Sequence, residues 1–341
     1  MDAISSKRVA ELLDSMRNRK IAVLGDLMLD RYLWGSVVRI SPEAPVPIVE
    51  VETESECLGG AANVANNIHS LGATALPIGI IGKDNSGLRL IELARSSGFP
   101  TDGIFFDETR PTTVKTRVIA HNQHVVRVDR ESKAEISPEI TRTIVQFLDQ
   151  VFPELDAIVL QDYNKGLLTR TLIHETIRLA QKHNTTITVD PKFNHFFEYR
   201  NVTVFKPNRK ETEQALGTRL AELGSLKEAA VHLKERLQCR NLLITLGEKG
   251  MLLLAEHGEH VTIPTRAKKV HDVSGAGDTV IGTLTAALSA RANILEAATL
   301  ANFAAGVVVG EVGAVPITRQ KLMEAIQMHE KETAGAARDQ S

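Results

Sequence analysis

The segment 272–278, DVSGAGD, combines a glycine-rich turn with a carboxylate, and a helical pattern follows it directly. Glycines let the backbone turn tightly, and the first amide groups of a helix have no partner within the helix. The N–H groups of Gly275, Ala276 and Gly277 are therefore expected to form an anion hole. A carboxylate at Asp278 is then placed to remove a proton from an attacking hydroxyl group. The alternative is that Asp278 only caps the helix after a Gly-rich turn.

A second glycine-rich segment, 59–63 (GGAAN), precedes a helix of small residues. Paired glycines at Gly59 and Gly60 permit the close approach of a ligand, and Asn63 can bond its hydroxyl groups. Tight packing of the helix explains this pattern equally well.

A third motif places Asn208 and Glu211 at the start of a predicted helix, just after the apolar run 202–205. Side chains three residues apart share one helix face, where both can order a hydrated magnesium ion or a phosphate. A surface capping box uses the same residue types, so that alternative stays open here.

Several other kinds of site have no motif in this sequence. We find no G-x-x-x-x-G-K-[ST] phosphate loop, no H-E-x-x-H metal site and no G-x-S-x-G around Ser274. Val280 stands where the third glycine of G-x-G-x-x-G belongs, which argues against a dinucleotide dehydrogenase. His257 and His260 are three apart but flank a polar turn, which favours a solvated loop over a metal pair.

The composition limits the classes of partner. The chain has 341 residues, with 40 Lys and Arg against 42 Asp and Glu, so its formal net charge is −2. Without a basic block, neither nucleic acid nor an anionic membrane is an expected partner. Two cysteines far apart, no signal-peptide pattern and no apolar run of about 18 residues predict a soluble, cytoplasmic protein. Residues 332–341 are expected to form a flexible tail.

Short apolar runs alternate with amphipathic stretches through most of the chain. The predicted strands are 21–25, 157–160, 186–189, 202–205 and 242–246. The predicted helices are 138–151, 169–183, 209–216, 225–237 and 280–290. This order predicts an α/β fold with a doubly wound, mostly parallel sheet and helices on both faces. Ligands of such sheets lie outside the carboxyl ends of the strands.

Two segments differ from this alternation. Residues 46–51 and 113–129 repeat apolar and polar side chains with a period of two. They predict antiparallel strands of a small accessory sheet, formed from about 33–52 and 112–130. We expect this sheet to be a lid inserted in a single domain that spans 1–341.

The three motifs occur together and in one order, and this combination resembles the PfkB or ribokinase-like carbohydrate kinases. Both signatures of that family fit in full, the first over 59–63 with two later glycines and the second over 272–278. The N-x-x-E element at 208–211 also matches. The resemblance spans about 20–315.

Within that family the chain most resembles the heptose 7-phosphate kinases of lipopolysaccharide core synthesis, including the kinase half of the bifunctional kinase/adenylyltransferase. The segments that carry the resemblance are 25–32 (GDLMLDRY), 39–47 (RISPEAPVP), 122–123 (NQ), 162–166 (DYNKG), 190–192 (DPK) and 272–282. Met28 replaces the Asn of the ribokinase pattern G-S-x-N-x-D, whereas Asp30 is retained. Nothing similar to the adenylyltransferase half follows, so we expect the stand-alone kinase.

The resemblance implies a reaction. The γ-phosphoryl group of ATP is transferred to the anomeric hydroxyl of D-glycero-β-D-manno-heptose 7-phosphate, which gives the 1,7-bisphosphate in ADP-heptose and lipopolysaccharide core biosynthesis. By this resemblance Asp278 is the base, the amides of the GAG turn stabilise the transferring group, and Asn208 with Glu211 holds Mg²⁺.

The resemblance also implies binding residues. The substrate contacts are Asp30, Gly59, Gly60, Asn63, Asp162 and Asp190. The ATP contacts are Asn208, Glu211, Thr245, Gly247, Gly250 and Asn302. Asp272 and Ser274 match positions at which many relatives, though not all, bind a monovalent cation such as K⁺.

The residues themselves favour a phosphorylated substrate. Lys115 and Arg117 are two apart in a predicted strand and so project from one face of the lid. If that face covers the sugar, the pair can neutralise a substrate phosphate, with Lys165 or Lys192 from the large sheet opposite. The alternative is a solvated face of an accessory strand.

The lid also predicts a partner. Val46, Ile48 and Val49 would be exposed on a small two-sided sheet, so we expect a homodimer in which two lids pair. Two other functions stay open: a PfkB kinase for another sugar, such as ribose, fructose or a keto-sugar, and a non-catalytic sugar-binding regulator. The presence of Asp278, Asn208 and Glu211 together argues against the regulator.

Overall fold

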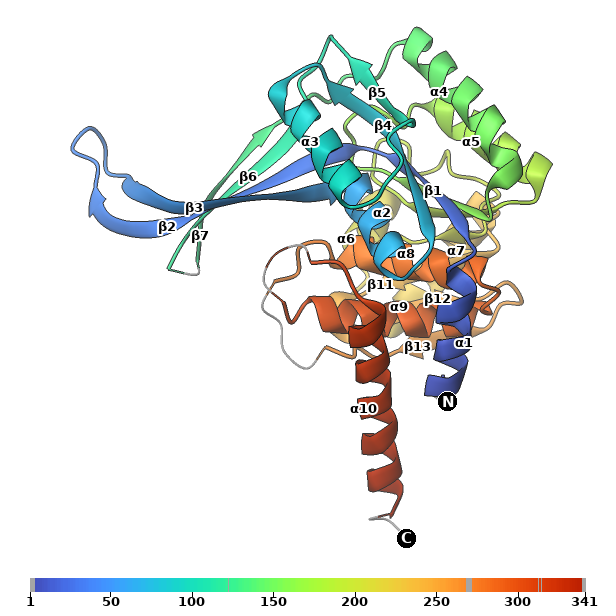
Figure 1. Cartoon of the computed structure of the whole chain (residues 1–341). Coiled ribbons are helices and arrows are strands. Elements are labelled where there is room, and N and C mark those ends of the chain that lie inside the picture. The colour runs from blue at the N-terminus through green and yellow to red at the C-terminus, as the bar shows by residue number, and fades with distance from the viewer. Residues whose placement is uncertain (1–3, 122, 268–271, 312, 314, 339–341) are drawn as a thin grey trace.

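The computed structural model describes residues 4–121, 123–267, 272–311, 313 and 315–338. Its body is a large sheet between two layers of helices, from which a small sheet projects (Figure 1). In spatial order the large sheet contains β13 (His260–Ile263), β12 (Met251–Leu254), β11 (Asn241–Thr245), β10 (Val204–Phe205), β9 (Thr186–Asp190), β8 (Ala157–Gln161), β1 (Lys20–Gly25), β4 (Thr74–Gly82) and β5 (Ile104–Asp107).

The large sheet is parallel from β11 to β5, and β12 and β13 add an antiparallel edge. This arrangement confirms the doubly wound, mostly parallel sheet predicted from the sequence. Register places Gly25 opposite Gln161 and Gln161 opposite Asp190, so the carboxyl ends of β1, β8 and β9 lie side by side. The polar residues that follow these strands therefore share one edge of the sheet.

Helices cover both faces of the sheet. One face packs against α1 (Ser6–Met16), α2 (Ala61–Ser70), α3 (Asn85–Ser96), α8 (Ala276–Ser289), α9 (Ile294–Val308) and α10 (Arg319–Arg338). The other packs against α4 (Pro138–Val151), α5 (Arg170–His183), α6 (Arg209–Leu216) and α7 (Leu223–Leu237). Alternate residues of β1 enter the two cores, with Ile21 in the first and Leu24 in the second, because successive strand side chains point to opposite faces.

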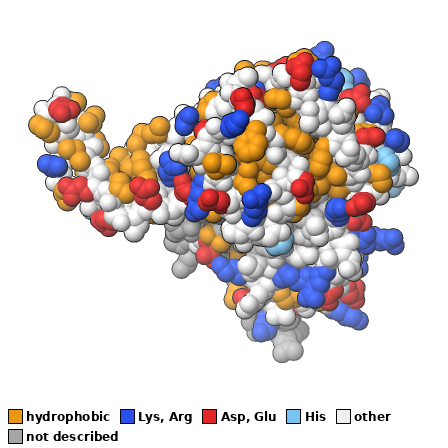
Figure 2. Space-filling model, turned by 45° about the horizontal axis from the view of Figure 1, so that its top comes forward, with side chains coloured by type: hydrophobic (Ala, Val, Ile, Leu, Met, Phe, Trp, Pro, Cys, Tyr) orange, Lys and Arg blue, Asp and Glu red, His pale blue; other side chains and the backbone are white. Residues whose placement is uncertain are grey.

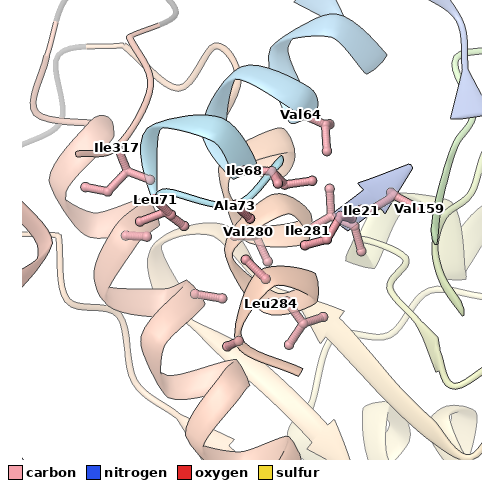
Figure 3. Packing of buried hydrophobic residues seen from close by; sticks show 14 of the residues in the cluster. Ile21, Val64, Ile68, Leu71, Ala73, Val159, Val280, Ile281, Leu284 and Ile317 are labelled. Carbon is pink, nitrogen blue, oxygen red and sulfur yellow. The ribbon is translucent and has the colours of Figure 1, made fainter. Parts of the chain in front are cut away.

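Helix α8 lies in the centre of the first core. It is buried without interruption from Asp278 to Ala287 and is mostly apolar, as expected for a helix with no solvent face. Figure 3 shows Ile281 of this helix beside Ile21 of β1 and Val159 of β8. The start of α8 is therefore anchored against the strand ends that carry polar residues.

The small sheet has the order β3-β2-β6-β7, with β2 (Leu27–Ile40), β3 (Pro47–Gly60), β6 (Thr113–Ala120) and β7 (Gln123–Arg130). Strands β2 and β3 are longer than the predicted segment, because β2 begins directly after β1 and β3 continues into α2. The prediction of antiparallel pairing holds for β2–β3 and β6–β7 but was wrong for β2 and β6, which pair in parallel. A parallel pair needs a long crossover, and the chain from β3 through α2, β4, α3 and β5 supplies it.

The C-terminal part differs from the sequence prediction. Helix α10 continues to Arg338, although we expected a flexible tail from residue 332, and residues 339–341 lie outside the described part of the chain. Within that described part, no helix is both long and apolar enough to span a membrane.

The first prediction concerns the contact between β1 and β8. A Cβ atom at Gly25 would fall on the carbonyl oxygen of Gln161 and 2.8 Å from its Cβ atom. We expect Gly25→Ala to lower the free energy of unfolding by about 1 to 3 kcal/mol, because the overlap is with backbone and parts the strands. Urea denaturation measures this change.

The matched control is Gly224→Ala in α7, where a Cβ atom would have no neighbour within 4 Å. This change should leave stability equal or raise it by less than about 1 kcal/mol. Equal unfolding free energies for Gly25→Ala and the wild type would contradict the close approach of the two strands.

Candidate active site

Asp278 occupies the first turn of α8 and is only 4% exposed. Three donors from three other elements surround its carboxylate. Tyr163 donates its hydroxyl to Oδ1 at 2.6 Å, Gln161 donates Nε2 to Oδ1 at 3.2 Å, and Asn63 donates Nδ2 to Oδ2 at 2.8 Å. Burial raises the pKa of Asp278 to about 6, while the hydrogen bonds from Tyr163 and Asn63 oppose the rise. The group is thus ionised at neutral pH and able to accept a proton.

The turn before Asp278 leads directly into α8. Gly275 is the N-cap of α8 with a φ of 76°, and no side chain caps the helix. The N–H of Ala276 bonds to the carbonyl of Val273 at 3.3 Å, so it is partly engaged. The remaining first-turn amides and the helix dipole face the region in front of Asp278.

A buried ion pair lies beside this turn. Lys206 contacts the Asp190 carboxylate at 3.0 Å, and the side chains are 3% and 8% exposed. A Cβ atom at Gly277 would be 3.8 Å from Asp190 Oδ2 and 3.9 Å from Lys206 Nζ. Lys206 therefore places an ammonium group, paired with Asp190, next to the predicted anion hole. Sequence reasoning missed it, although it directly follows β10 at the ligand-binding edge of the sheet.

The loop after β8 is held by a carboxylate that sequence reasoning also missed. Asp26, between β1 and β2, accepts hydrogen bonds from the backbone N–H groups of Tyr163 at 2.8 Å, Lys165 at 3.1 Å and Leu167 at 3.4 Å. Burial, followed by repulsion from Asp162, raises the pKa of Asp26 to about 6. Three converging amides identify Asp26 as the residue that shapes this loop.

Asp162, predicted to contact substrate, is 2% exposed and is used within the protein. It accepts hydrogen bonds from the N–H of Asn164 and the hydroxyl of Tyr199, both at 2.7 Å. Asp162 therefore stabilises the loop after β8, as Asp26 does.

On the small sheet, Asp30 of β2 pairs with Arg117 of β6 at 2.8 Å, and both are largely buried. A Cβ atom at Gly59 would approach Asp30 Oδ2 to 2.7 Å, which explains the glycine there. Gly60 has a φ of 57° and turns the chain from β3 into α2, where Asn63 faces Asp278. The structure thus brings Asp30, Gly59, Gly60 and Asn63 together.

The basic residues predicted to hold a phosphate differ in their partners. Lys165 pairs with Glu131 at 2.6 Å, and Lys192 pairs with Glu211. Among the described residues we find no ion pair for Lys115, whose ammonium lies 4.9 Å from the centroid of the Tyr163 ring. Burial lowers the pKa of Lys115, and the charge of Asp30 opposes this effect. The positive charges of Lys165 and Arg117 lower the pKa further, whereas Asp129 raises it.

Asn208 and Glu211 form a capping box at the start of α6. Asn208 Oδ1 accepts the Glu211 N–H at 2.9 Å, and Glu211 Oε2 accepts the Asn208 N–H at 2.8 Å. Cap and metal roles are compatible, because a carboxylate has about four acceptor positions, of which the Asn208 N–H and the Lys192 ammonium use two. No group of three or more His, Cys, Asp or Glu able to hold a metal occurs among the described residues. One carboxylate with water and phosphate ligands suits Mg²⁺, so this pair fits a hydrated magnesium ion.

The predicted nucleotide residues lie along the adjacent strand ends. Thr245 ends β11 and forms an isolated bridge with Asn208, and Gly247 and Gly250 bound the short helix η2 (Gly247–Lys249). Asn302 of α9 donates to the Pro264 carbonyl at 2.7 Å. A Cβ atom at Gly250 would lie 2.8 Å from the carbonyl carbon of Pro264, so Gly250 and Asn302, distant in sequence, both approach this proline.

The predicted cation ligands are close to the GAG turn. Asp272 accepts the N–H groups of Ser274 at 2.8 Å and Gly313 at 3.3 Å. Cation binding by Asp272 and Ser274 stays a prediction.

Comparisons with known proteins accord with this geometry. A family model described as pfkB family carbohydrate kinase matches residues 18–321. The bifunctional protein HldE of Helicobacter pylori (strain J99) is 45% identical over 295 residues, which are 86% of this chain and 64% of that protein. The HldE of Helicobacter hepaticus is 45% identical over 310 residues, covering 91% and 64%. The chain thus spans less than two thirds of the length of these relatives.

Solved structures share the fold. A ribokinase of Arabidopsis thaliana complexed with ribose and ATP has a TM-score of 0.72 and 17% identity, covering 90% of this chain and 98% of that one. Phosphofructokinase-2 of Escherichia coli in complex with potassium has a TM-score of 0.75 and 19% identity, covering 91% and 98%.

The second prediction concerns the cost of burying Asp278. An acid whose pKa is higher in the folded than in the unfolded protein binds more protons when folded, so its contribution to stability falls as pH rises from about 4 to about 6. We expect the stability of Asp278→Asn, relative to wild type, to rise by about 1 to 3 kcal/mol between pH 4 and pH 7.5. Urea denaturation across this range measures it. A difference independent of pH would contradict a raised pKa at Asp278.

Proposed function

Since the chain belongs to the pfkB family of carbohydrate kinases, we propose that it transfers the γ-phosphoryl group of ATP to the anomeric hydroxyl of D-glycero-β-D-manno-heptose 7-phosphate. The product is the 1,7-bisphosphate, and on this proposal the chain serves ADP-heptose and lipopolysaccharide core biosynthesis. The relatives named bifunctional protein HldE and the site segments similar to heptose 7-phosphate kinases support this substrate.

One observation carries the proposal. Lys115 and Arg117 on the small sheet and Lys192 beyond β9 converge on Asp30 and Tyr163, next to the carboxylate of Asp278. A neutral sugar needs no cluster of cations, whereas a sugar phosphate does. Lys115 forms no direct ion pair among the described residues, although the charges of Asp30 and Asp129 act on it, so its ammonium can still bind a substrate phosphate.

The residues divide the chemical step among them. The Asp278 carboxylate takes the proton of the anomeric hydroxyl of the sugar. The oxygen of that hydroxyl bonds to the γ-phosphorus of ATP, and the bond from this phosphorus to the ADP oxygen breaks. The amide groups at the start of α8 and the Lys206 ammonium stabilise the negative charge of the group in transfer. Asp30 and Asn63 hold the sugar hydroxyls.

ATP lies on the opposite side of the GAG turn in this proposal. Thr245, Gly247, Gly250 and Asn302 border the nucleotide, and Asn208 with Glu211 holds Mg²⁺ through water. When bound, the metal supplies charge neutralisation at the phosphates. Lys192, paired with Glu211, then stands between the metal ligands and the sugar site.

The alternative is a kinase of this family for another sugar, because the residues do not determine hydroxyl stereochemistry at the pocket. A regulator without catalysis is disfavoured by the joint placement of Asp278, Asn208 and Glu211.

The third prediction is a substrate preference, measured as ADP release from ATP. Heptose 7-phosphate should give a kcat/KM at least about tenfold above those of unphosphorylated heptose, ribose and fructose 6-phosphate, because only its phosphate reaches the basic cluster in the required pose. Asp278→Asn should lower kcat by about 10²- to 10⁴-fold. A preference for an unphosphorylated sugar would exclude the proposed substrate.

Lys115→Gln tests the phosphate contact within the same assay. It should raise the KM for heptose 7-phosphate about 10- to 100-fold, the value of one charged hydrogen bond, and leave the KM for unphosphorylated heptose unchanged. Lys83→Gln is the matched control, because that lysine is 70% exposed and pairs with Glu108 at another part of the surface. An equal effect of both changes would remove the phosphate site.

The small sheet leads to a proposal about assembly. Its exposed apolar side chains include Val38, Ile40, Val46, Val51, Val125, Val126 and Val128. Figure 2 shows hydrophobic side chains spread over this projecting arm. Register places Val126 opposite Val118, on the sheet face away from Arg117. We propose that this outer face packs against the same face of a second copy, while the inner face covers the sugar.

The fourth prediction is therefore a dimer at micromolar concentration by light scattering. Introducing Val126→Asp with Val128→Asp should give a folded monomer, because charges are then buried in the interface. Leu223→Asp is the control: this residue is 45% exposed at the start of α7 and should leave the dimer intact. A wild-type monomer at micromolar concentration would contradict the proposal.

A further inference from the structure

Tyr163 contacts two functional groups of the site with different parts of one side chain. Its hydroxyl donates to Asp278 Oδ1 at 2.6 Å. Its ring lies under two ammonium groups, with Lys115 Nζ at 4.9 Å and Lys192 Nζ at 5.6 Å from the ring centroid. These lysines come from different sheets, so Tyr163 is the point at which the small sheet, the large sheet and the carboxylate of α8 meet.

The position of Tyr163 is determined at its backbone as well. Its N–H donates to Asp26 at 2.8 Å, and Asp26 also binds two further N–H groups of the same loop. A tyrosine has only two side-chain torsions before its hydroxyl, so anchoring the backbone and ring leaves little freedom for the hydroxyl. The hydrogen bond to Asp278 is therefore built into the fold before any substrate binds.

The hydroxyl of Tyr163 acts as a donor. Burial, and then the charge of Asp278, hold the pKa of Tyr163 well above its ordinary value, so the hydroxyl keeps its proton. Its hydrogen bond stabilises the ionised form of Asp278. It also fixes the orientation of the carboxylate, because Oδ1 must point toward the Tyr163 hydroxyl.

We propose that Tyr163 is a positioning residue for the phosphoryl transfer: its hydroxyl orients Asp278 toward the acceptor hydroxyl, and its ring is the floor on which Lys115 and Lys192 hold the phosphate of the sugar. The inference rests on the proposed function and deepens it. One side chain then sets the distance between the phosphate of the substrate and the base that activates its other end. A sugar without a phosphate cannot bind the two lysines above the ring. A sugar whose phosphate lies at a different distance from its reacting hydroxyl cannot reach the lysines and Asp278 at the same time.

The ammonium groups give the ring its role. A cation over an aromatic face is attracted to the π-electrons, and the attraction is strongest where water is excluded. Both ammonium groups lie within 5.6 Å of the centre of one ring, and a dianionic phosphate bound by both relieves the repulsion between their like charges.

The fifth prediction separates hydroxyl from ring. Tyr163→Phe keeps the ring and removes the donor to Asp278. Its kcat for heptose 7-phosphate should fall about tenfold at pH 8, with the KM within about twofold of wild type. The acid limb of its kcat/KM profile should move up by about 1 pH unit, because the ionised base loses a charged hydrogen bond. The protonation of the sugar phosphate and of ATP also changes with pH, but it affects the profiles of the variant and the wild type equally and so does not alter the difference between them.

Tyr163→Leu removes the ring as well. It should repeat the shift of the acid limb and also raise the KM for heptose 7-phosphate by about tenfold, since both lysines lose their support. Tyr199→Phe is the matched control: Tyr199 is fully buried and donates to a different carboxylate, Asp162, at 2.7 Å. It should lower stability without moving the acid limb. An acid limb that is the same in wild type and Tyr163→Phe would overturn the inference, and so would a change in KM alone for the Phe variant.

A readout without substrate distinguishes failure of this inference from failure of the proposed function. The pH dependence of the stability difference between the wild type and Asp278→Asn reports the pKa of Asp278 in the free protein. When both proteins also carry Tyr163→Phe, the upper bend of that curve should move up by about 1 pH unit. The result does not depend on which sugar is phosphorylated, and an unmoved bend would refute the role of the hydroxyl.

Discussion

The burial of one carboxylate at the start of a buried helix is the constraint on which the site depends. Asp278 has three hydrogen-bond donors, each from a different part of the chain: α2, the end of β8 and the loop after it. An unpaired charge at such a position would be strongly destabilising, so these donors are required for the fold as well as for chemistry. Their convergence brings the glycine-rich turn, the strand ends and α2 into one site.

The need to compensate buried charges also explains the polar residues that lie around these donors. Asp26 organises the backbone of the loop that presents Tyr163, and Lys206 neutralises Asp190 beside the first turn of α8. Asp26 and Asp278 both have pKa values raised to about 6 by burial, so both carboxylates lower the stability of the fold at neutral pH, and perturbed groups of this kind are common at functional sites. The surrounding apolar core around Ile281 supports these buried charges with close packing.

The small sheet connects specificity with architecture. Because β2 begins directly after β1, Asp30 is rigidly linked to the central strand, and the parallel pairing of β2 with β6 brings Lys115 opposite Asp30. An antiparallel arrangement throughout would have placed Lys115 elsewhere. The inner face of this sheet therefore carries the charges that would select a phosphorylated sugar, whereas Val126 and Val128 are exposed on its outer face.

Local patterns in the sequence were sufficient for the fold class, for most strands and helices of the large sheet and for the three motifs at 59–63, 208–211 and 272–278. Glycine spacing, caps and hydrophobic periodicity act over a few residues, so they are legible without the fold. Only the tertiary structure decided the parallel pairing of β2 with β6. It also decided the contacts made by Asp26, Lys206 and Gln161. The same holds for the contact of the Tyr163 ring with Lys115 and Lys192. The neighbouring sequence does not reveal what these residues do, because each acts through a partner far away in sequence that only the register of the strands brings close.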